Sequence, residues 1–185
     1  MSKSKGNVID PLAVTDLYGA DALRMALVIG NTPGKDIIIS EEKIKGYRNF
    51  ANKIWNASRF ILMNLEGFNG QKPQLTNHDK KLLRDFKAIE KKVSNHLNKY
   101  RFSLAGETLY HYFWHTFADK IIEEMKQRIN INKDVLASQY ILFIILKDSL
   151  KMLHPFMPFI TEAIWQQLDK YHQKKEKLLI TSLWP

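Results

Sequence analysis

Apolar residues recur at every third or fourth position along most of this chain, which is the spacing of an amphipathic helix. Residues 41–65 show the pattern most regularly. The other stretches with this spacing are residues 77–97, 103–122, 134–153 and 161–168. The alternation that is typical of a strand is nearly absent after Ile39. The pattern therefore predicts an all-α fold, with the helices of residues 41–185 packed as a helical bundle.

The first forty residues form a smaller unit ahead of the bundle. Asp10 can cap a helix, and Pro11 occupies the favoured first helical position. Gly19 interrupts the apolar pattern, so we expect two short helices between residues 10 and 30. A β-branched run at residues 36–39 is typical of a short extended segment. The sequence thus predicts two parts, a small helical connector (residues 1–40) and the bundle (residues 41–185).

Polar residues mark where the bundle helices begin. Ser40 precedes two glutamates, whose charge suits the positive end of a helix dipole. Asn77 and Ser103 are placed to cap the next two helices. Residues 134–153 are apolar nearly all round the middle, which indicates a buried central helix. Two prolines follow it, and we expect the final helix to begin at Thr161.

Composition excludes several classes of protein. The 185 residues contain no cysteine, which excludes disulfides and thiolate metal sites and fits a reducing cytoplasm. The longest apolar run, residues 140–146, is too short to cross a bilayer, so we expect no membrane partner. His111 and His115 are four residues apart and could share a zinc ion, but no third ligand stands near them. We interpret them as a polar surface stripe and predict no metal.

The net charge of +9 and the pI near 9.6 favour an anionic partner. Basic pairs stand at Lys80-Lys81 and Lys91-Lys92, and a longer basic run occupies residues 170–177. Lysine-rich helices are often only solvated faces, and DNA or acidic lipid would suit the charge equally well. The charge therefore indicates an anionic partner but does not distinguish RNA from DNA or acidic lipid.

One helical face carries groups suited to RNA. The polar side of residues 41–60 presents Arg48, Asn49, Asn52, Lys53, Asn56 and Arg59. Amide and guanidinium groups can hydrogen-bond to base edges, while lysine meets phosphate as a point charge. Asparagine is a poor helix former, so three of them on one helix require a reason. The alternative is that they tie the helix to neighbouring loops.

An aromatic block follows at residues 110–117. Helical spacing predicts that Phe113 and Phe117 are buried. Tyr110 and Trp114 are better placed to expose a ring on which an unpaired base could stack.

The opening residues suit polyphosphate. Ser2 and Ser4 supply hydroxyls, Lys3 supplies a cation, and Gly6 lets the backbone approach a ligand closely. The alternative is an unstructured basic N-terminus.

Four blocks of sequence resemble the class I aminoacyl-tRNA synthetases, namely residues 1–11, 41–60, 100–114 and 154–165. Residues 1–4 are similar to the last four residues of the Lys-Met-Ser-Lys-Ser signature, and residues 6–11 are typical of the branch that charges valine, isoleucine and leucine. Residues 47–60 are more similar to the valyl-tRNA synthetases than to the isoleucyl or leucyl enzymes, and residues 154–162 resemble the same branch. The signature's first lysine would precede Met1, so we expect a C-terminal fragment of a larger synthetase that is inactive alone and holds no cofactor.

The resemblance implies an activity for the intact enzyme. It would activate valine with ATP and Mg²⁺ and transfer the valyl group to tRNA(Val). Ser2, Lys3 and Ser4 would contact the ATP phosphates, with Lys3 as the catalytic cation beside the departing pyrophosphate. The bundle would bind the anticodon arm through its Arg48–Arg59 face. We expect a cytoplasmic monomer that binds no DNA.

Two alternatives stay open. The bundle could be the anticodon-binding domain of an isoleucyl- or leucyl-tRNA synthetase. It could also be a non-catalytic, basic helical interaction domain whose charge serves solubility alone.

Overall fold

The computed structural model describes residues 10–31, 39–168, 171 and 178–185, and these residues form helices and loops without a β-strand. The helices are α1 (Pro11–Tyr18), α2 (Ala20–Val28), α3 (Glu41–Asn64), α4 (Asn77–Asn98), α5 (Phe102–His111), the π-helix η2 (Tyr112–Ile121), α6 (Ile122–Asn130), α7 (Val135–Leu153), α8 (Pro158–Leu168) and the 3-10 helix η4 (Leu179–Thr181). The predicted all-α bundle is confirmed.

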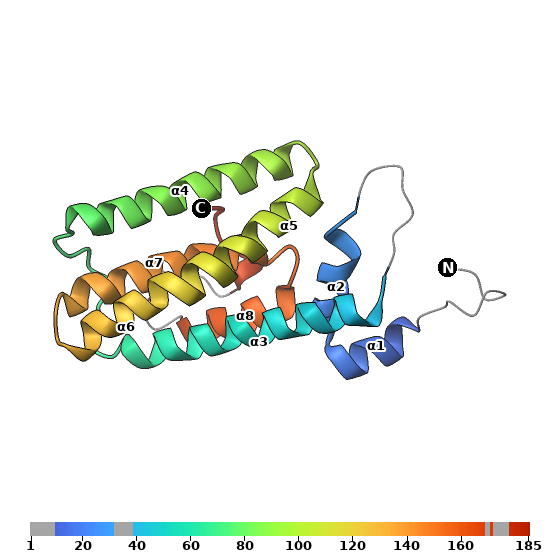
Figure 1. The fold of residues 1–185 in the computed structure, drawn as a ribbon, viewed down its shortest axis with the longest axis horizontal. Helices are drawn as coiled ribbons and strands as arrows, with labels where there is room; N and C mark the ends of the chain where they lie inside the picture. The colour runs from blue at the N-terminus through green and yellow to red at the C-terminus, as the bar shows by residue number, and fades with distance from the viewer. Residues whose placement is uncertain (1–9, 32–38, 169–170, 172–177) are drawn as a thin grey trace.

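Long helices run side by side along the molecule (Figure 1). Helices α3 and α4 lie at opposite edges of the bundle, and α5, η2 and α6 form one continuous rod between them. Helix α7 packs against α3, α4, α5, α6 and α8. Most of its residues are buried, so the central position predicted from its apolar sequence is confirmed.

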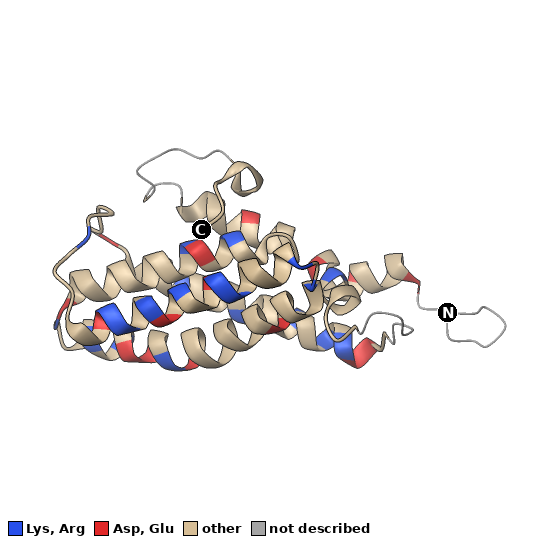
Figure 2. Cartoon of the chain, turned by 90° about the horizontal axis from the view of Figure 1, so that it is seen from above, with Lys and Arg blue, Asp and Glu red and all other residues tan. Residues whose placement is uncertain are grey.

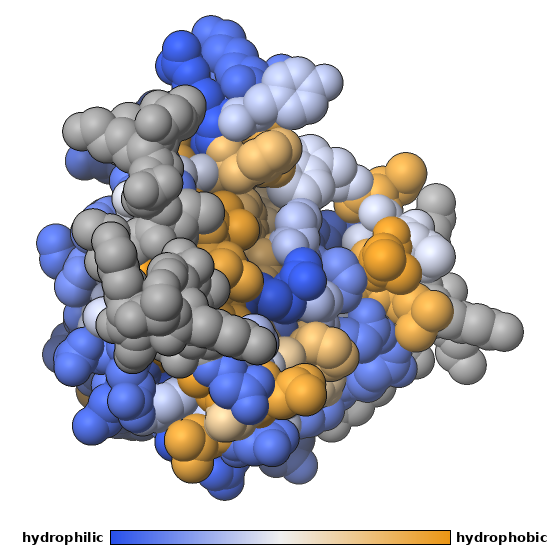
Figure 3. Space-filling view, turned by 90° about the vertical axis from the view of Figure 1, so that its right-hand side faces the viewer, coloured by the Kyte–Doolittle hydropathy of each residue, from blue (hydrophilic) through white to orange (hydrophobic). Residues whose placement is uncertain are grey.

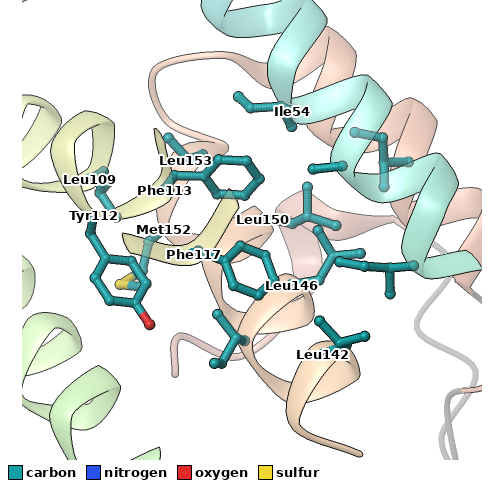
Figure 4. Close-up of a cluster of buried hydrophobic side chains, with 14 of the residues drawn as sticks. Ile54, Leu109, Tyr112, Phe113, Phe117, Leu142, Leu146, Leu150, Met152 and Leu153 are labelled. Carbon is teal, nitrogen blue, oxygen red and sulfur yellow. The ribbon is translucent and has the colours of Figure 1, made fainter. Parts of the chain in front are cut away.

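The core is made where α7 meets α3 and the α5–η2 rod. Ile54 of α3, Phe113 and Phe117 of η2, and Leu146 and Leu150 of α7 are all buried and point toward one another (Figure 4). Packing of this extent supplies most of the free energy that stabilises a bundle. It also fixes the rotation of α3, and therefore which side of α3 faces outward.

Three expected helix starts are wrong. Thr76, not Asn77, caps α4, and its hydroxyl and the Asp79 carboxylate form a capping box. Helix α5 begins at Phe102, and Ser103 lies inside it. Helix α8 begins at Pro158 rather than Thr161, because proline fits the first turn of a helix.

A residue far away in the sequence secures the start of α8. The Asp21 carboxylate of α2 accepts hydrogen bonds from the backbone N–H groups of Phe159 and Ile160, at 3.2 and 2.7 Å. Burial raises the pKa of Asp21, and these two bonds oppose that rise. Arg24, one turn further along α2, donates to the carbonyl of Pro155 at 3.0 Å. The corner between α7 and α8 is thereby tied to the connector.

Helix α2 packs on two sides. Met25 and Ile29 belong to the main core, whereas Ala22 and Ala26 join Ile44 of α3 in a second apolar cluster that also includes Val14 of α1. Both short helices were expected, and Asp10 caps α1 with Pro11 in its first turn, as predicted.

Some apolar side chains stay at the surface of the α1–α2 end. Leu12 and Leu17 of α1 are exposed, and Figure 3, which looks onto this end, shows hydrophobic side chains separated by polar ones. Within the described ranges, no helix combines the length and the apolar character needed to cross a membrane.

Candidate nucleic-acid interface

The polar face of α3 points away from the core. Arg48, Asn49, Asn52, Asn56 and Arg59 are exposed, and Lys53 is partly exposed. The opposite side of the helix buries Ile44, Phe50, Ile54, Ala57, Ser58 and Ile61. Since residues three and four apart share a helical face, the exposed groups form one stripe along the helix. We call these six polar residues the α3 face. Their proposed contacts with RNA stay a prediction.

The three asparagines are not used to hold the fold together. Within the part of the chain that the structure describes, the side chains of Asn49, Asn52 and Asn56 have no hydrogen-bond partner. Asn64, at the end of the same helix, instead donates to the backbone carbonyl of Phe60 at 2.7 Å. The alternative that these three asparagines tie α3 to neighbouring loops therefore finds no support among the described residues, and their amides are available to a ligand.

Lys53 differs from the rest of the α3 face. Its ammonium donates a hydrogen bond to the Asp119 carboxylate at 2.7 Å and lies 5.7 Å from the centre of the Trp114 ring. Asp119 is separated from it by 66 positions in sequence, so the α3 pattern gave no sign of this pair. A lysine that is paired with a carboxylate offers less net charge to phosphate than a free one.

Aromatic side chains form the border of the α3 face. Trp114 stacks on the buried ring of Phe50 with centroids 6.0 Å apart, and Tyr110 lies 4.8 Å from the same ring. Phe113 and Phe117 are buried, as predicted. Tyr110 and Trp114 are partly exposed, which fits the prediction that they keep ring surface for another group.

These rings sit at the point where an α-helix becomes a π-helix. Residues 112–121 were expected to continue the α-helix that precedes them, but they form the π-helix η2. A π-helix widens the backbone and changes the direction of each side chain relative to an α-helix, and such segments are frequent at functional sites. The apolar spacing alone does not distinguish the two, which is why sequence reasoning missed η2.

A cavity of about 380 Å³ opens beside Lys43 and Tyr47, between α3 and α5. The Lys43 ammonium donates to the carbonyl of Ile29 at 2.6 Å, and burial lowers its pKa. Burial also raises the pKa of Tyr47 to about 12. The Lys43 ammonium is therefore used in a contact within the fold, Tyr47 is half-buried, and we assign this cavity no ligand.

The two histidines of the predicted polar stripe lie at the surface. The rings of His111 and His115 stack with their centroids 5.8 Å apart, and His115 is 3.7 Å from the Asp119 carboxylate. Among the described residues, no group of three or more metal-ligating side chains comes together.

Ser2, Lys3 and Ser4, the predicted contacts to ATP phosphates, lie outside the described residues. The same is true of the expected extended segment, apart from Ile39, and of most of the basic run at 170–177.

Two family models match the chain. The anticodon-binding domain of tRNA ligase matches residues 79–185, and the class I tRNA synthetases for isoleucine, leucine, methionine and valine match residues 1–40. The second match includes the opening residues that resemble the family signature.

The curated relatives of the chain are valine–tRNA ligases. The protein of Geobacter sulfurreducens is 48% identical over 175 residues, which are 91% of this chain and 20% of that protein. The protein of Carboxydothermus hydrogenoformans is 44% identical over 189 residues, covering 100% of this chain and 21% of that protein. The chain thus spans about a fifth of the length of the curated relatives that it matches. The resemblance to the valyl-tRNA synthetases is confirmed.

Solved synthetases share the fold. A leucyl-tRNA synthetase of Agrobacterium radiobacter K84, solved as a ternary complex with tRNA and LeuAMS, superposes with a TM-score of 0.75 at 21% identity over 100% of this chain and 22% of that chain. A methionyl-tRNA synthetase of Mycobacterium tuberculosis in complex with methionyl-adenylate gives 0.78 at 22% identity, over 97% of this chain and 38% of that one. Because the anticodon-binding model covers more than half of a chain with this fold, the chain belongs to the family of anticodon-binding domains of tRNA ligases.

Proposed function

We propose that this chain serves a valine–tRNA ligase by binding the anticodon arm of tRNA(Val) through the α3 face. The observation that carries the proposal is the exposed row of asparagine and arginine side chains on α3, beside the ring of Trp114. The valine–tRNA ligase relatives support the choice of tRNA.

The chemistry of the α3 face matches an unpaired anticodon. The amide of an asparagine has both donors and an acceptor, so it can pair with the edge of a base that is not in a duplex. Arg48 and Arg59 can each hold a phosphate with two parallel hydrogen bonds, or stack on a base. Trp114 supplies a ring on which a splayed base can rest. The asparagine side chains would thus read the bases, while the two arginines would hold the RNA in position.

The opening residues would serve the catalytic step of the intact ligase. The carboxylate of valine attacks the α-phosphate of ATP, forming valyl-adenylate and releasing pyrophosphate. Lys3 would stand against the departing pyrophosphate, where a fixed cation counters charge that grows in the transition state. Ser2 and Ser4 would orient the same loop, and Mg²⁺ would neutralise the other phosphate oxygens. This part of the proposal rests on sequence, through the signature at residues 1–4 and the class I match over residues 1–40.

The proposal includes the setting of the protein. We infer that the ligase works as a monomer in the cytoplasm, with valine, ATP and tRNA(Val) as its substrates and with no DNA or membrane partner. The final step would place the valyl group on the 3′ end of the tRNA.

Filter binding tests the anticodon part of the proposal. The chain is titrated with tRNA(Val) and with the same tRNA carrying a changed anticodon, and tighter binding to the unchanged tRNA is expected. The double variant Asn52→Ala, Asn56→Ala should reduce that difference by about tenfold, because lost base contacts cost about 1–3 kcal/mol. Equal affinities of the unaltered chain for both tRNAs would defeat the proposal.

The catalytic part is tested in the full-length ligase. The Lys3→Gln variant should lower the rate of valine-dependent exchange between ATP and pyrophosphate by about 10²–10³-fold, the effect of removing one transition-state contact. Lys5→Gln is the matched control, since it removes an equal charge from the same loop outside the proposed contact. A similar loss in both variants would mean that only the charge of the loop matters.

A further inference from the structure

In helix α4, most acidic residues are buried and all lysine and arginine residues are exposed. Of its acidic residues, Asp79 and Glu90 are buried, and only Asp85 is exposed. Its lysines and arginine are all exposed, namely Lys80, Lys81, Arg84, Lys87, Lys91 and Lys92. We call these six residues the α4 face. A helix that merely needs solubility can mix both signs on its surface, whereas this one exposes a nearly uniform positive charge.

The buried acids of α4 are already neutralised from within. Asp79 receives a hydrogen bond from Arg128 of α6 at 2.6 Å. Glu90 pairs with Lys87 at 2.5 Å, and burial raises the pKa of its carboxyl group. Neither carboxylate therefore offsets the remaining cations at the surface.

Exposed cations form a line on the side of α4 that faces away from the core, and one of them, Lys87, is paired with Glu90. Lys80, Arg84, Lys87 and Lys91 are spaced by four, three and four residues, which places them on one side of the helix. At 1.5 Å per residue the line is about 16 Å long. A nucleic-acid strand places one phosphate about every 3.4 Å along a duplex axis, so the line faces roughly five of them. Figure 2 looks down on this side and shows lysine and arginine segments recurring along the bundle.

The electrostatic potential beside the line of α4 cations, around His96, is positive as well. His96 lies one turn beyond Lys92, and burial together with Lys92, Arg101 and Lys99 lowers the pKa of its imidazole. It borders a groove of about 600 Å³ between α4 and the α5–η2 rod, which is also lined by Lys92, Glu107, His111 and His115. Glu107 is the one acidic group among the lining residues described. The charged groups named beside His96, namely Lys92, Lys99 and Arg101, are thus all cations.

We infer that the α4 face is a second RNA-binding surface, which contacts the phosphate backbone without regard to sequence. The inference rests on the proposed function, since it takes RNA as the polyanion. The α4 face differs from the α3 face in its position and in its chemistry. Helices α3 and α4 lie at opposite edges of the bundle (Figure 1), and α4 exposes cations without asparagine from Lys80 to Lys91, since its asparagines stand only in its first and last turns. Fixed cations in a row suit phosphates, whose spacing is the same in every sequence.

The test compares two triple variants of the full chain. The first, Lys80→Gln, Arg84→Gln, Lys91→Gln, removes three charges from the α4 face and leaves the Lys87–Glu90 pair intact. The control, Lys72→Gln, Lys120→Gln, Lys133→Gln, removes three exposed charges from elsewhere on the molecule. Both variants therefore have the same net charge. Binding to tRNA(Val), to its anticodon variant and to an unrelated RNA hairpin is measured from 50 to 200 mM salt.

The α4 variant should flatten the dependence of log K on log salt by about two units for all three RNAs, because each lost phosphate contact removes about 0.7–0.9. The control should leave the slope nearly unchanged. Equal slopes in both triple variants would overturn the inference. Discrimination between the two tRNAs by the unaltered chain is read separately, so failure of the α3 proposal is distinguished from failure of this one.

Discussion

The ammonium group of Lys53 and the carboxylate of Asp119 are joined at 2.7 Å, at the border between α3 and η2. Lys53 is therefore already partnered before any RNA arrives, unlike the asparagines beside it. Both side chains are partly exposed, so the pair adds little to stability. Its main effect is to withhold one cation from the α3 face.

Removing the acid should release that cation. We expect Asp119→Asn to strengthen RNA binding by about two- to fivefold at low salt, since one more charge becomes available to a phosphate. The salt dependence of filter binding should steepen by less than about one unit. Glu123→Gln is the control, because Glu123 pairs with Lys126 instead, at 3.5 Å. A gain of the same size in the control would show that only net charge had changed.

Trp114 should support a stacked base. Trp114→Leu is expected to weaken tRNA(Val) binding by about 1–3 kcal/mol, the usual contribution of one base on one ring. Trp114→Phe keeps a ring over Phe50 and should retain most of the affinity. Circular dichroism of both variants checks that the bundle is intact. If the leucine and phenylalanine variants bind equally well, no base stacks there.

Gly106 of α5 lies against the side chain of Ile29, the residue that follows α2. A Cβ at this position would lie 2.9 Å from the Cδ1 atom of Ile29, which is too close for an unstrained contact. Gly106→Ala should therefore destabilise the fold by about 1–3 kcal/mol, measured by urea unfolding. The double variant with Ile29→Val removes that atom and should recover part of the loss.

Gly46 provides the matched comparison. It lies within α3, and no atom would come within 4 Å of an added Cβ there. Gly46→Ala should therefore stabilise the chain by about 0.5–1 kcal/mol, because alanine favours the helix. Destabilisation at both glycines would show that Ile29 is not the cause.

The buried Asp79 should make the fold sensitive to acid. Burial raises the pKa of its carboxyl group, but hydrogen bonds from Arg128 and Thr76 outweigh that and leave the pKa lowered overall. A lowered folded-state pKa contributes stability that is present above the unfolded value of about 4 and is lost as the pH falls through the folded value. Asp79→Asn should cost about 1–3 kcal/mol of unfolding free energy at pH 7, because Arg128 loses one of its two carboxylate partners and keeps Glu124.

The difference between the unaltered chain and Asp79→Asn should shrink as the pH falls below about 4, which urea unfolding at several pH values would reveal. His78→Gln is the control. His78 pairs with Glu124 at 2.9 Å in an exposed position, so its loss should cost less than about 1 kcal/mol. A cost for Asp79→Asn that did not change with pH would contradict the assignment to its ionised carboxylate.

Most of the helices were predictable because their signals are local. The apolar spacing of residues 41–65 requires one side of α3 to be buried, which by itself predicts that Arg48 and Arg59 face outward. Asp10 and Pro11 likewise mark the start of α1. The expected boundary between connector and bundle at residue 40 stays a prediction.

The features that sequence missed depend on distant partners. Asp21 caps α8 across 138 positions, so no local pattern reveals this cap, although Pro158 itself marks where the helix begins. The Lys53–Asp119 pair depends on how η2 is rotated, and the apolar spacing does not reveal a π-helix. The burial of Asp79 required knowing that Arg128 would reach it from α6. Lys3 carries a motif but lies outside the described residues, so its role is still argued from sequence.

Helix α2 places Met25 in one apolar cluster and Ala22 in the other, and it holds the α7–α8 corner through Asp21 and Arg24. Helices α1 and α2 should therefore unfold cooperatively with the bundle, and heating should give a single calorimetric transition. A rotation imposed on α2 would be passed to α3 and α8 as rigid-body movement. If the chain binds RNA through the α3 face as proposed, helix α2 would couple that face mechanically to the α7–α8 corner.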